Sequence, residues 1–170
     1  MGLFTPTLLK NRIYEITADE LQQCGVEALL LDVDNTLTEH HSQELDAVTE
    51  AWLTAMKAAG VKLMLVSNSK EPRVAPFAAR IALPYVHTSL KPLPFGFFRA
   101  AKALGVPRSA CMAVGDQSFT DVLGAKLAGV RVVQLIPIKV EDGWSFHLRR
   151  RLEQPILRHT RKKLSRKDVR

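Results

Sequence analysis

Short apolar runs alternate with segments of helical periodicity along this chain, and that alternation constrains its fold more than any other feature. The apolar runs predict five strands, at residues 26–33, 61–66, 84–87, 110–114 and 130–136. Apolar residues between these runs recur every three or four positions, which predicts helices. The expected helices cover residues 42–59, 72–81, 94–104 and 118–128. Because no hairpin signal joins neighbouring runs, we expect a doubly wound α/β domain with a mostly parallel five-stranded sheet.

The chain is long enough for one globular domain, which we place at residues 1–140. Its 170 residues are 46% hydrophobic, enough for a single sizeable core. Residues 3–16 are apolar with interspersed bases, and Thr17 followed by Glu20 is typical of a helix start, so we expect an N-terminal helical extension. No apolar run approaches about 18 residues, and the N-terminus lacks a secretion signal. The two cysteines have no recognisable spacing, and we interpret them as reduced thiols of a cytoplasmic protein.

Residues 141–170 differ in charge from this domain and form a basic tail. Residues 149–170 hold ten Lys or Arg and two acids, a net charge of +8, whereas the whole chain carries +7. The other 148 residues are therefore nearly neutral, at −1. Leu148, Leu152 and Ile156 recur every four positions among arginines, which is typical of a basic amphipathic segment that binds an anionic bilayer. A solvated tail without a membrane partner is the alternative.

Polar or charged residues follow every predicted strand except the last. Ligands of doubly wound sheets bind beyond the carboxyl ends of the strands. The residues at or just beyond these ends are Asp32, Asp34, Ser67, Asn68, Lys91, Asp116 and Asp121. Carboxylates as close as Asp32 and Asp34 repel each other, and both lose water on burial, so a bound cation is the expected compensation.

These groups together predict a phosphate site built around a divalent cation. Asp32 and Asp116 can each give an oxygen to Mg²⁺, which prefers hard oxygen ligands. Lys91 adds a fixed positive charge, while the Ser67 hydroxyl and the loop amides after Asp32 add donors for the phosphate. Since no cysteine or serine has an adjacent base, we expect the Asp32 carboxylate to attack phosphorus and form an aspartyl phosphate. Asp34 would protonate the leaving oxygen and then deprotonate the attacking water.

The same residues resemble the motifs of the haloacid dehalogenase (HAD) superfamily of aspartate-nucleophile phosphatases. DVDNT matches the first motif, VSNS ends its strand as the second motif does, KP supplies the third, and GDQSFTD matches the fourth. The resemblance implies that Asp32 is the nucleophile and Asp34 the general acid and base. It also implies that the backbone carbonyl of Asp34 ligates the metal beside Asp32 and Asp116. Asp121 is implied to support metal-bound waters or Lys91.

Several residues next to these motifs are expected to contact the substrate. We expect Thr36 and Asn68 to bind its phosphate. Arg73 stands at the start of a predicted helix, where the helix dipole does not favour a base, and this indicates a role with substrate anions. His40 and His41 follow the first motif in a short flap, and we interpret them as loop histidines, with substrate contact as the alternative.

Over residues 3 to about 160 the chain is similar to the bacterial YqeG branch of capless, subclass IIIA phosphatases. The similarity is carried by YEITADELQQCGVEALLLDVDNTLT, SNSKEPRVAPFA, KPLPFGFFRAA and VGDQSFTDVLGAKLAGVRVVQLIPI. That branch resembles mitochondrial phosphatidylglycerophosphatases. Predicted elements use up the 32 residues between Asp34 and Ser67 and the 23 between Ser67 and Lys91. We therefore expect no cap domain and an open site.

An open site suits a phosphate carried by something large. We expect a phospholipid head-group monoester, phosphatidylglycerophosphate by resemblance, and a protein that lies in the cytoplasm or peripherally on the inner membrane surface. The enzymatic alternatives are a phosphatase of nucleic acid ends or of small phosphometabolites. A basic nucleic-acid-binding protein with an incidental phosphatase site is an alternative of another class.

Overall fold

The computed structural model describes residues 2–39, 42–138, 151, 155, 157 and 158. Its centre is a six-stranded sheet in the order β1-β6-β5-β2-β3-β4, and every neighbouring pair is parallel. The strands are β1 (Leu8–Lys10), β2 (Ala28–Leu31), β3 (Lys62–Val66), β4 (Tyr85–Val86), β5 (Cys111–Gly115) and β6 (Arg131–Leu135). The predicted doubly wound α/β fold is confirmed, with one strand more than the sequence indicated.

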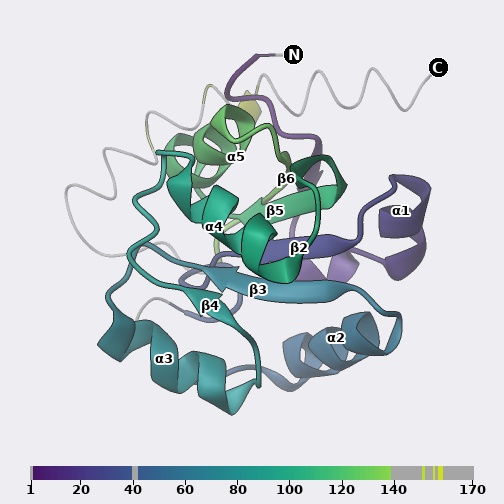
Figure 1. Ribbon diagram of the computed structural model, residues 1–170, viewed down its shortest axis with the longest axis vertical. Coiled ribbons are helices and arrows are strands. Elements are labelled where there is room, and N and C mark those ends of the chain that lie inside the picture. The colour runs from purple at the N-terminus through teal and green to yellow at the C-terminus, as the bar shows by residue number, and fades with distance from the viewer. Residues whose placement is uncertain (1, 40–41, 139–150, 152–154, 156, 159–170) are drawn as a thin grey trace.

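Helices cover both faces of the sheet (Figure 1). One face carries α1 (Ala18–Gln23), α2 (Ala47–Ala58) and α3 (Glu71–Arg80), and the other carries α4 (Phe95–Leu104) and α5 (Leu123–Leu127). Side chains along a strand point alternately to opposite faces. Accordingly Leu29 and Leu31 of β2 pack in the core with Trp52 and Phe77, whereas Leu30 packs with Phe97. Burial on both faces explains why β2 is uniformly apolar.

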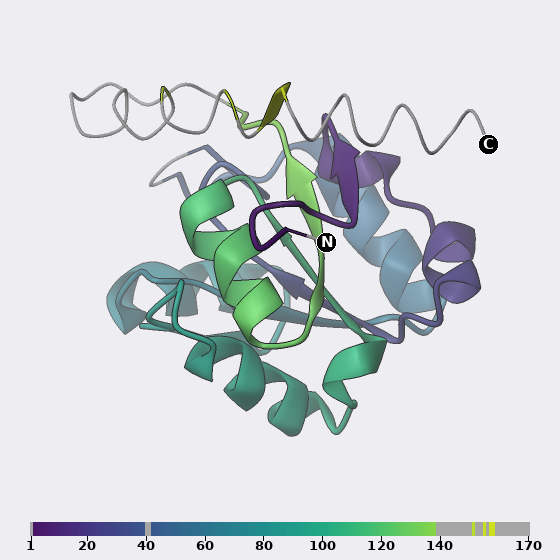
Figure 2. The ribbon, with the colours of Figure 1, turned by 90° about the horizontal axis from the view of Figure 1, so that it is seen from above.

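The additional strand lies in the segment that the sequence assigned to a helical extension. β1 pairs with β6 at the edge of the sheet, with Leu8 opposite Val133 (Figure 2). A single 3₁₀ turn (Ile13–Glu15) and α1 follow, and the Thr17 hydroxyl accepts the Glu20 amide as predicted for a cap. β1 has only three residues, all half-buried, so it lacks the continuous apolar run by which the inner strands were found.

Two predicted helices differ from the observed ones at their N-terminal ends. α2 begins at Ala47 instead of residue 42, because Asp46 caps it by accepting the Thr49 amide at 2.9 Å. The helix expected at residues 118–128 is a π-helical turn (Ser118–Val122) followed by α5. Such wide turns are frequent at functional sites.

The chain reverses its direction of travel across the sheet between β2 and β5. From β2 the chain proceeds through β3 and β4 toward one edge of the sheet. It then returns through the helix α4 to β5, which lies on the other side of β2. Ligands bind at such a switch point, where the connections diverge and leave a crevice. Asp32 directly follows β2 and Asp116 directly follows β5, so both lie at this crevice.

The connections from β2 to β4 contain α2 and α3 and, among the residues described, no further domain. The expected absence of a cap is therefore in agreement with the structure. Within the described part of the chain, no helix is long and apolar enough to cross a bilayer. His40, His41 and most of the basic tail lie outside the described residues.

Candidate active site

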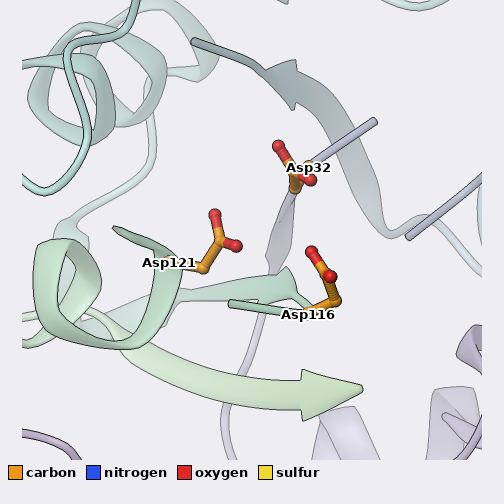
Figure 3. A group of neighbouring side chains, drawn as sticks. All are labelled: Asp32, Asp116 and Asp121. Atoms are coloured by element: carbon orange, nitrogen blue, oxygen red, sulfur yellow. The ribbon is translucent and has the colours of Figure 1, made fainter. Parts of the chain in front are cut away.

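Three buried carboxylates gather at the switch point (Figure 3). Asp32 comes from the end of β2, Asp116 from the end of β5, and Asp121 from the π-helical turn. One oxygen of each lies within 4.8 Å of the others, and the residues are 9%, 1% and 2% exposed. Three negative groups in so small and dry a space require positive charge close by.

Lys91 supplies part of that charge. Its Nζ lies 2.6 Å from Asp32 Oδ1, 2.6 Å from Asp121 Oδ1 and 2.9 Å from the Val66 carbonyl oxygen. The three protons of the ammonium group thus each have an acceptor. Lys91 is therefore the common counter-charge of Asp32 and Asp121. The third carboxylate of the cluster, Asp116, is not among the hydrogen-bond partners of this ammonium group.

The approach of Asp121 to the other carboxylates depends on a glycine at the end of β5. A Cβ atom on Gly115 would lie 2.3 Å from Cγ of Asp121, so no other residue fits without a shift. The Gln117 amide donates to Asp121 Oδ2 at 3.1 Å and fixes the other side of the carboxylate. Gly115 and the π-helical turn together bring Asp121 into the cluster.

Burial disfavours the ionised form of Asp32 in this cluster. Burial raises the pKa of Asp32 to about 7, against the opposing effect of Lys91 and with a further increase from Asp121. Burial alone would lower the pKa of Lys91, but the charges of Asp121 and Asp32 outweigh it and raise that pKa. Lys91 is thus a permanent cation, whereas Asp32 needs additional positive charge to be fully ionised at neutral pH.

The donor set of the cluster fits a divalent cation. Hard carboxylate oxygens are the ligands that Mg²⁺ and similar ions prefer, and two or three of them with water complete an octahedron. Asp32 and Asp116 are the two carboxylates that the sequence predicts as metal ligands. In the structure the Asp121 carboxylate lies in the same cluster. A cation here would offset the repulsion and lower the pKa of Asp32.

The turn after β2 is closed by its own hydrogen bonds. The amides of Thr36, Leu37 and Thr38 all donate to the Val33 carbonyl, and the Asn35 amide donates to the Thr38 carbonyl at 2.7 Å. The expectation that the amides of this loop face the phosphate is therefore wrong for residues 35–38, since the turn uses them. The Thr36 hydroxyl lies 3.4 Å from Asp32 Oδ2 and donates to that carboxylate, while its phosphate contact stays a prediction.

Ser67 and Asn68, at the end of β3, have different environments. Ser67 is 2% exposed, and its Oγ accepts the Ser69 amide at 3.1 Å, which leaves the hydroxyl proton for another acceptor. The Asn68 side chain receives the Lys91 amide at 2.7 Å and the Ser89 hydroxyl at 2.8 Å, and donates to the Lys91 carbonyl at 2.9 Å. Asn68 therefore fixes the backbone on which Lys91 stands, while its phosphate contact stays a prediction.

Asp34 lies apart from the buried cluster and is paired with Arg73. The Arg73 Nη2 lies 2.7 Å from Asp34 Oδ1 and also donates to the Ser42 carbonyl at 2.8 Å. The Ser69 hydroxyl donates to Asp34 Oδ2 at 3.3 Å. Arg73 thus joins α3 both to Asp34, two residues after Asp32, and to Ser42, just after the predicted flap. The sequence did not indicate these contacts. The predicted contact of Arg73 with the substrate stays a prediction.

The last strand also contributes a polar group, which the sequence interpretation missed. Gln134 of β6 is fully buried, and its Nε2 donates to the Ser118 hydroxyl at 2.7 Å and to the Asp116 carbonyl at 3.4 Å. It therefore holds the backbone that carries Asp116. The sequence did contain a sign of this role, because Gln134 is the single polar residue in the otherwise apolar run VVQLI. A polar side chain buried on an inner strand needs a hydrogen-bond partner.

Comparison with known proteins agrees with this architecture. A family model described as haloacid dehalogenase-like hydrolase matches residues 48–129, a range that holds Lys91, Asp116 and Asp121. The probable phosphatase YqeG of Bacillus subtilis is 31% identical over 160 residues, which cover 94% of this chain and 93% of that protein.

Solved structures show the same fold at low identity. A Listeria monocytogenes protein superimposes with a TM-score of 0.56 at 18% identity, covering 69% of this chain and 85% of its own. CbbY of Rhodobacter sphaeroides, solved in complex with phosphate, gives a TM-score of 0.53 at 17% identity, with coverage of 71% and 91%. Fold, site and sequence together define a phosphatase. The chain belongs to the haloacid dehalogenase-like hydrolases, in the family of the probable phosphatase YqeG.

Proposed function

We propose that this phosphatase is a Mg²⁺-dependent phosphomonoester hydrolase that forms an aspartyl phosphate on Asp32. The observation that carries the proposal is the group of Asp32, Asp116 and Asp121, buried at the switch point with Lys91 as counter-charge. A bound Mg²⁺ would screen the charge of the substrate phosphate and keep Asp32 ionised.

The residues of the chain then divide the chemical work. An Asp32 carboxylate oxygen attacks phosphorus, the bond from phosphorus to the ester oxygen breaks, and Asp34 gives its proton to the departing oxygen. Asp34, now ionised, takes a proton from a water molecule that attacks the phosphorus of the aspartyl phosphate. This second step releases inorganic phosphate and restores both carboxyl groups. Ser67 donates its hydroxyl proton to a phosphate oxygen in both steps, and Lys91 keeps Asp32 in position.

We further propose a phospholipid head-group monoester, phosphatidylglycerophosphate, as the substrate. The open surroundings of the site support a large substrate, because no cap is present among the described residues to enclose a small one. The net charge of +7, concentrated in the tail, supports a location at an anionic membrane surface. A phosphatase of nucleic acid ends is the second candidate, since the same charge also suits that partner.

A substrate panel tests this proposal. Phospholipid, nucleotide, sugar and nucleic-acid-end monoesters are compared at equal concentration, with Mg²⁺ and again after chelation. We expect turnover to need Mg²⁺ and to be fastest for the phospholipid monoester. Faster turnover of nucleic acid ends would refute the phospholipid substrate and favour the second candidate. Activity that survives chelation would refute the metal-dependent mechanism.

A further inference from the structure

The half of the domain around β4 and α4 contains no acidic residue over a long stretch of sequence. Residues 72–115 hold six Lys or Arg and no Asp or Glu, whereas residues 1–148 together are slightly acidic. Four of the six bases, Arg80, Arg99, Lys102 and Arg108, are exposed. Arg99, Lys102 and Arg108 lie on or just after α4, whereas Arg80 ends α3 on the opposite face of the sheet. The α4 face therefore has a group of exposed bases of its own, separate from the basic tail.

The same stretch exposes the densest group of apolar side chains in the described part of the chain. Seven large apolar or aromatic residues are exposed in the described part of the chain as a whole, and three of them, Leu90, Leu93 and Phe95, lie in this stretch within six residues of one another. They are 55%, 48% and 55% exposed. A cluster of this kind rimmed by charge is a mark of an interaction surface.

This apolar cluster flanks the catalytic lysine. Lys91 is 7% exposed and points into the site, whereas its neighbour Leu90 points out to solvent. Leu93 follows two residues later, so its Cα lies at most about 8 Å from that of Lys91. Leu90 and Leu93 belong to the loop that follows β4 at the carboxyl edge of the sheet, the edge that also holds the carboxylate cluster.

The backbone holds Leu90 outward at an energetic cost. Leu90 has a φ of 60°, in the left-handed region that branched apolar residues rarely adopt. The Asn68 side chain fixes the loop on both sides of it, through the Ser89 hydroxyl and the Lys91 amide. Strained residues held in place by their surroundings are concentrated at functional sites.

Further along the same side, the surface of α4 is hollowed. A cavity of about 410 Å³ combines an apolar lining with two bases at its margin. Its lining residues are Phe98, Ala101, Lys102, Val106, Pro107 and Arg108. An apolar hollow with cations at its edge is complementary to an anionic amphiphile.

We propose that this β4–α4 surface, formed by Leu90, Leu93, Phe95 and the bases of α4, docks the domain on an anionic lipid bilayer. Two leucines and a phenylalanine can insert among acyl chains while the bases stay at the head groups. A nucleic acid would instead require hydrogen-bonding or stacking groups. Of the three apolar residues only Phe95 can stack on a base, and the two leucines offer no such group, which favours acyl chains. The proposal rests on the proposed function only for its purpose, which is to present a lipid-borne phosphate to the site.

Removal of the apolar side chains is the direct test. The triple variant Leu90→Asn, Leu93→Ser, Phe95→Ser keeps every charge, and Asn tolerates the left-handed backbone of position 90. Its matched control is Leu3→Ser, Val48→Ser, Leu127→Ser, which removes apolar groups that are 55%, 56% and 49% exposed elsewhere. Both are made in the full chain, so the tail contributes equally to both. Co-sedimentation uses phosphatidylcholine vesicles with about one-third phosphatidylglycerol at physiological salt.

We expect the triple variant to bind these vesicles at least about tenfold more weakly than the wild type, and the control to bind within about twofold of it. Lys102→Glu should weaken binding to anionic vesicles by about fivefold or more and leave binding to neutral vesicles unchanged. Unchanged vesicle binding by the triple variant would overturn the proposal. So would a loss confined to RNA retention, or a wild-type dimer that the triple variant converts to a monomer.

Folding and substrate are controlled separately. Hydrolysis of nitrophenyl phosphate should be the same for both triple variants and the wild type. The midpoint of thermal unfolding of the Leu90, Leu93, Phe95 variant should stay the same or rise, because Asn relieves the left-handed strain at position 90. If the triple variant does not fold, Phe95→Trp replaces it, and its fluorescence should be quenched by brominated acyl chains beyond the wild-type background from Trp52 and Trp144. Absence of that quenching also overturns the proposal. If docking is lost as expected but the wild type does not hydrolyse phosphatidylglycerophosphate, the docking surface stands and the proposed substrate fails.

Discussion

Asp32 and Asp34 are two residues apart in the sequence, yet they lie in two different regions of the site. The floor of the site consists of Asp32, Asp116, Asp121 and Lys91, all at most 9% exposed. Asp32 and Asp116 follow core strands, Asp121 belongs to the π-helical turn, and Lys91 stands in the loop after β4 that Asn68 fixes. The rim consists of Asp34 and Arg73, whose side chains are 14% and 13% exposed, close to the 11% of the Asp32 side chain. The two regions therefore differ in their partners: Lys91 binds the floor carboxylates Asp32 and Asp121, whereas Arg73 from α3 and the Ser69 hydroxyl bind Asp34.

The difference suggests how the two carboxylates are adapted to different tasks. A nucleophile needs a fixed position and a constant charge, which a buried site with a cation can provide. A general acid and base gives its proton to the leaving oxygen and regains one from the attacking water, so it must reach both, which a group outside the buried cluster can do. The predictions below test whether floor and rim differ in this way.

The largest effect is expected from a change in the floor. Asp32→Asn removes the attacking oxygen, so turnover of nitrophenyl phosphate should fall by at least about 10⁴-fold. The midpoint of thermal unfolding should stay the same or rise, because the change removes one of three like charges while Lys91 keeps its bonds to Asp121 and the Val66 carbonyl. Appreciable turnover by the purified variant would refute the mechanism.

Loss of the acid in the rim should depend on the leaving group. Asp34→Asn should slow hydrolysis of alkyl phosphates by about 10³-fold. Formation of the aspartyl phosphate from nitrophenyl phosphate should be much less affected, because nitrophenolate departs without a proton. Single-turnover measurements of the first step on both substrates make the comparison. Equal losses on the two substrates would show that Asp34 is not the acid.

The metal requirement should respond to the floor alone. Asp116→Ala removes one carboxylate from the cluster, so the Mg²⁺ concentration for half-maximal activity should rise by about 100-fold. Arg73→Gln, a rim change, serves as the control and should leave that concentration within about twofold of the wild type. An unchanged requirement in Asp116→Ala would remove Asp116 from the ligand set.

The smallest effect is expected from Arg73, and it separates two roles. If Arg73 positions Asp34, Arg73→Gln should lower kcat for alkyl phosphates by about tenfold with little change in KM, because the ion pair of 2.7 Å is lost. If Arg73 binds the substrate, as the sequence suggested, KM should rise instead and kcat should be kept. Arg73→Lys should restore part of kcat only in the first case.

The sequence predicted the floor better than the rim, and the reason is geometric. Strand periodicity places the residues after β2 and β5 at one edge of a parallel sheet, so Asp32 and Asp116 could be paired without a structure. The contact between Arg73 and Asp34 depends on where a long side chain ends, which spacing along the chain does not reveal. The motif resemblance placed Asp121 beside Lys91, where it lies, but it did not reveal the π-helical turn that carries it. No local sequence pattern distinguishes that turn from an ordinary α-helical start.

The fold was predicted where an apolar run marks the element. β2, β3, β5 and β6 are largely apolar strands buried on both faces, and the short edge strand β4 lies within the run predicted at residues 84–87. β1 is also a short edge strand, but its half-buried residues form no distinct run, and it was not found. Gln134 was overlooked because it sits inside an apolar run and was counted with its apolar neighbours. Its partners, the Asp116 carbonyl and the Ser118 hydroxyl, belong to another strand end and become visible only in three dimensions.

The pairing of β2 with β5 has a consequence for how activity arises during folding. Ala28 lies opposite Cys111 and Leu31 opposite Val114, so this pairing joins segments that are far apart along the chain. Non-local contacts of this kind form late and slowly, because a long loop must close before they can form. The segment from β2 to β4 can pair its strands earlier, but it holds Asp32 without Asp116. We therefore expect phosphatase activity during refolding to appear only after β5 has docked, later than the helical signal, so that enzyme activity reports the pairing of β2 with β5.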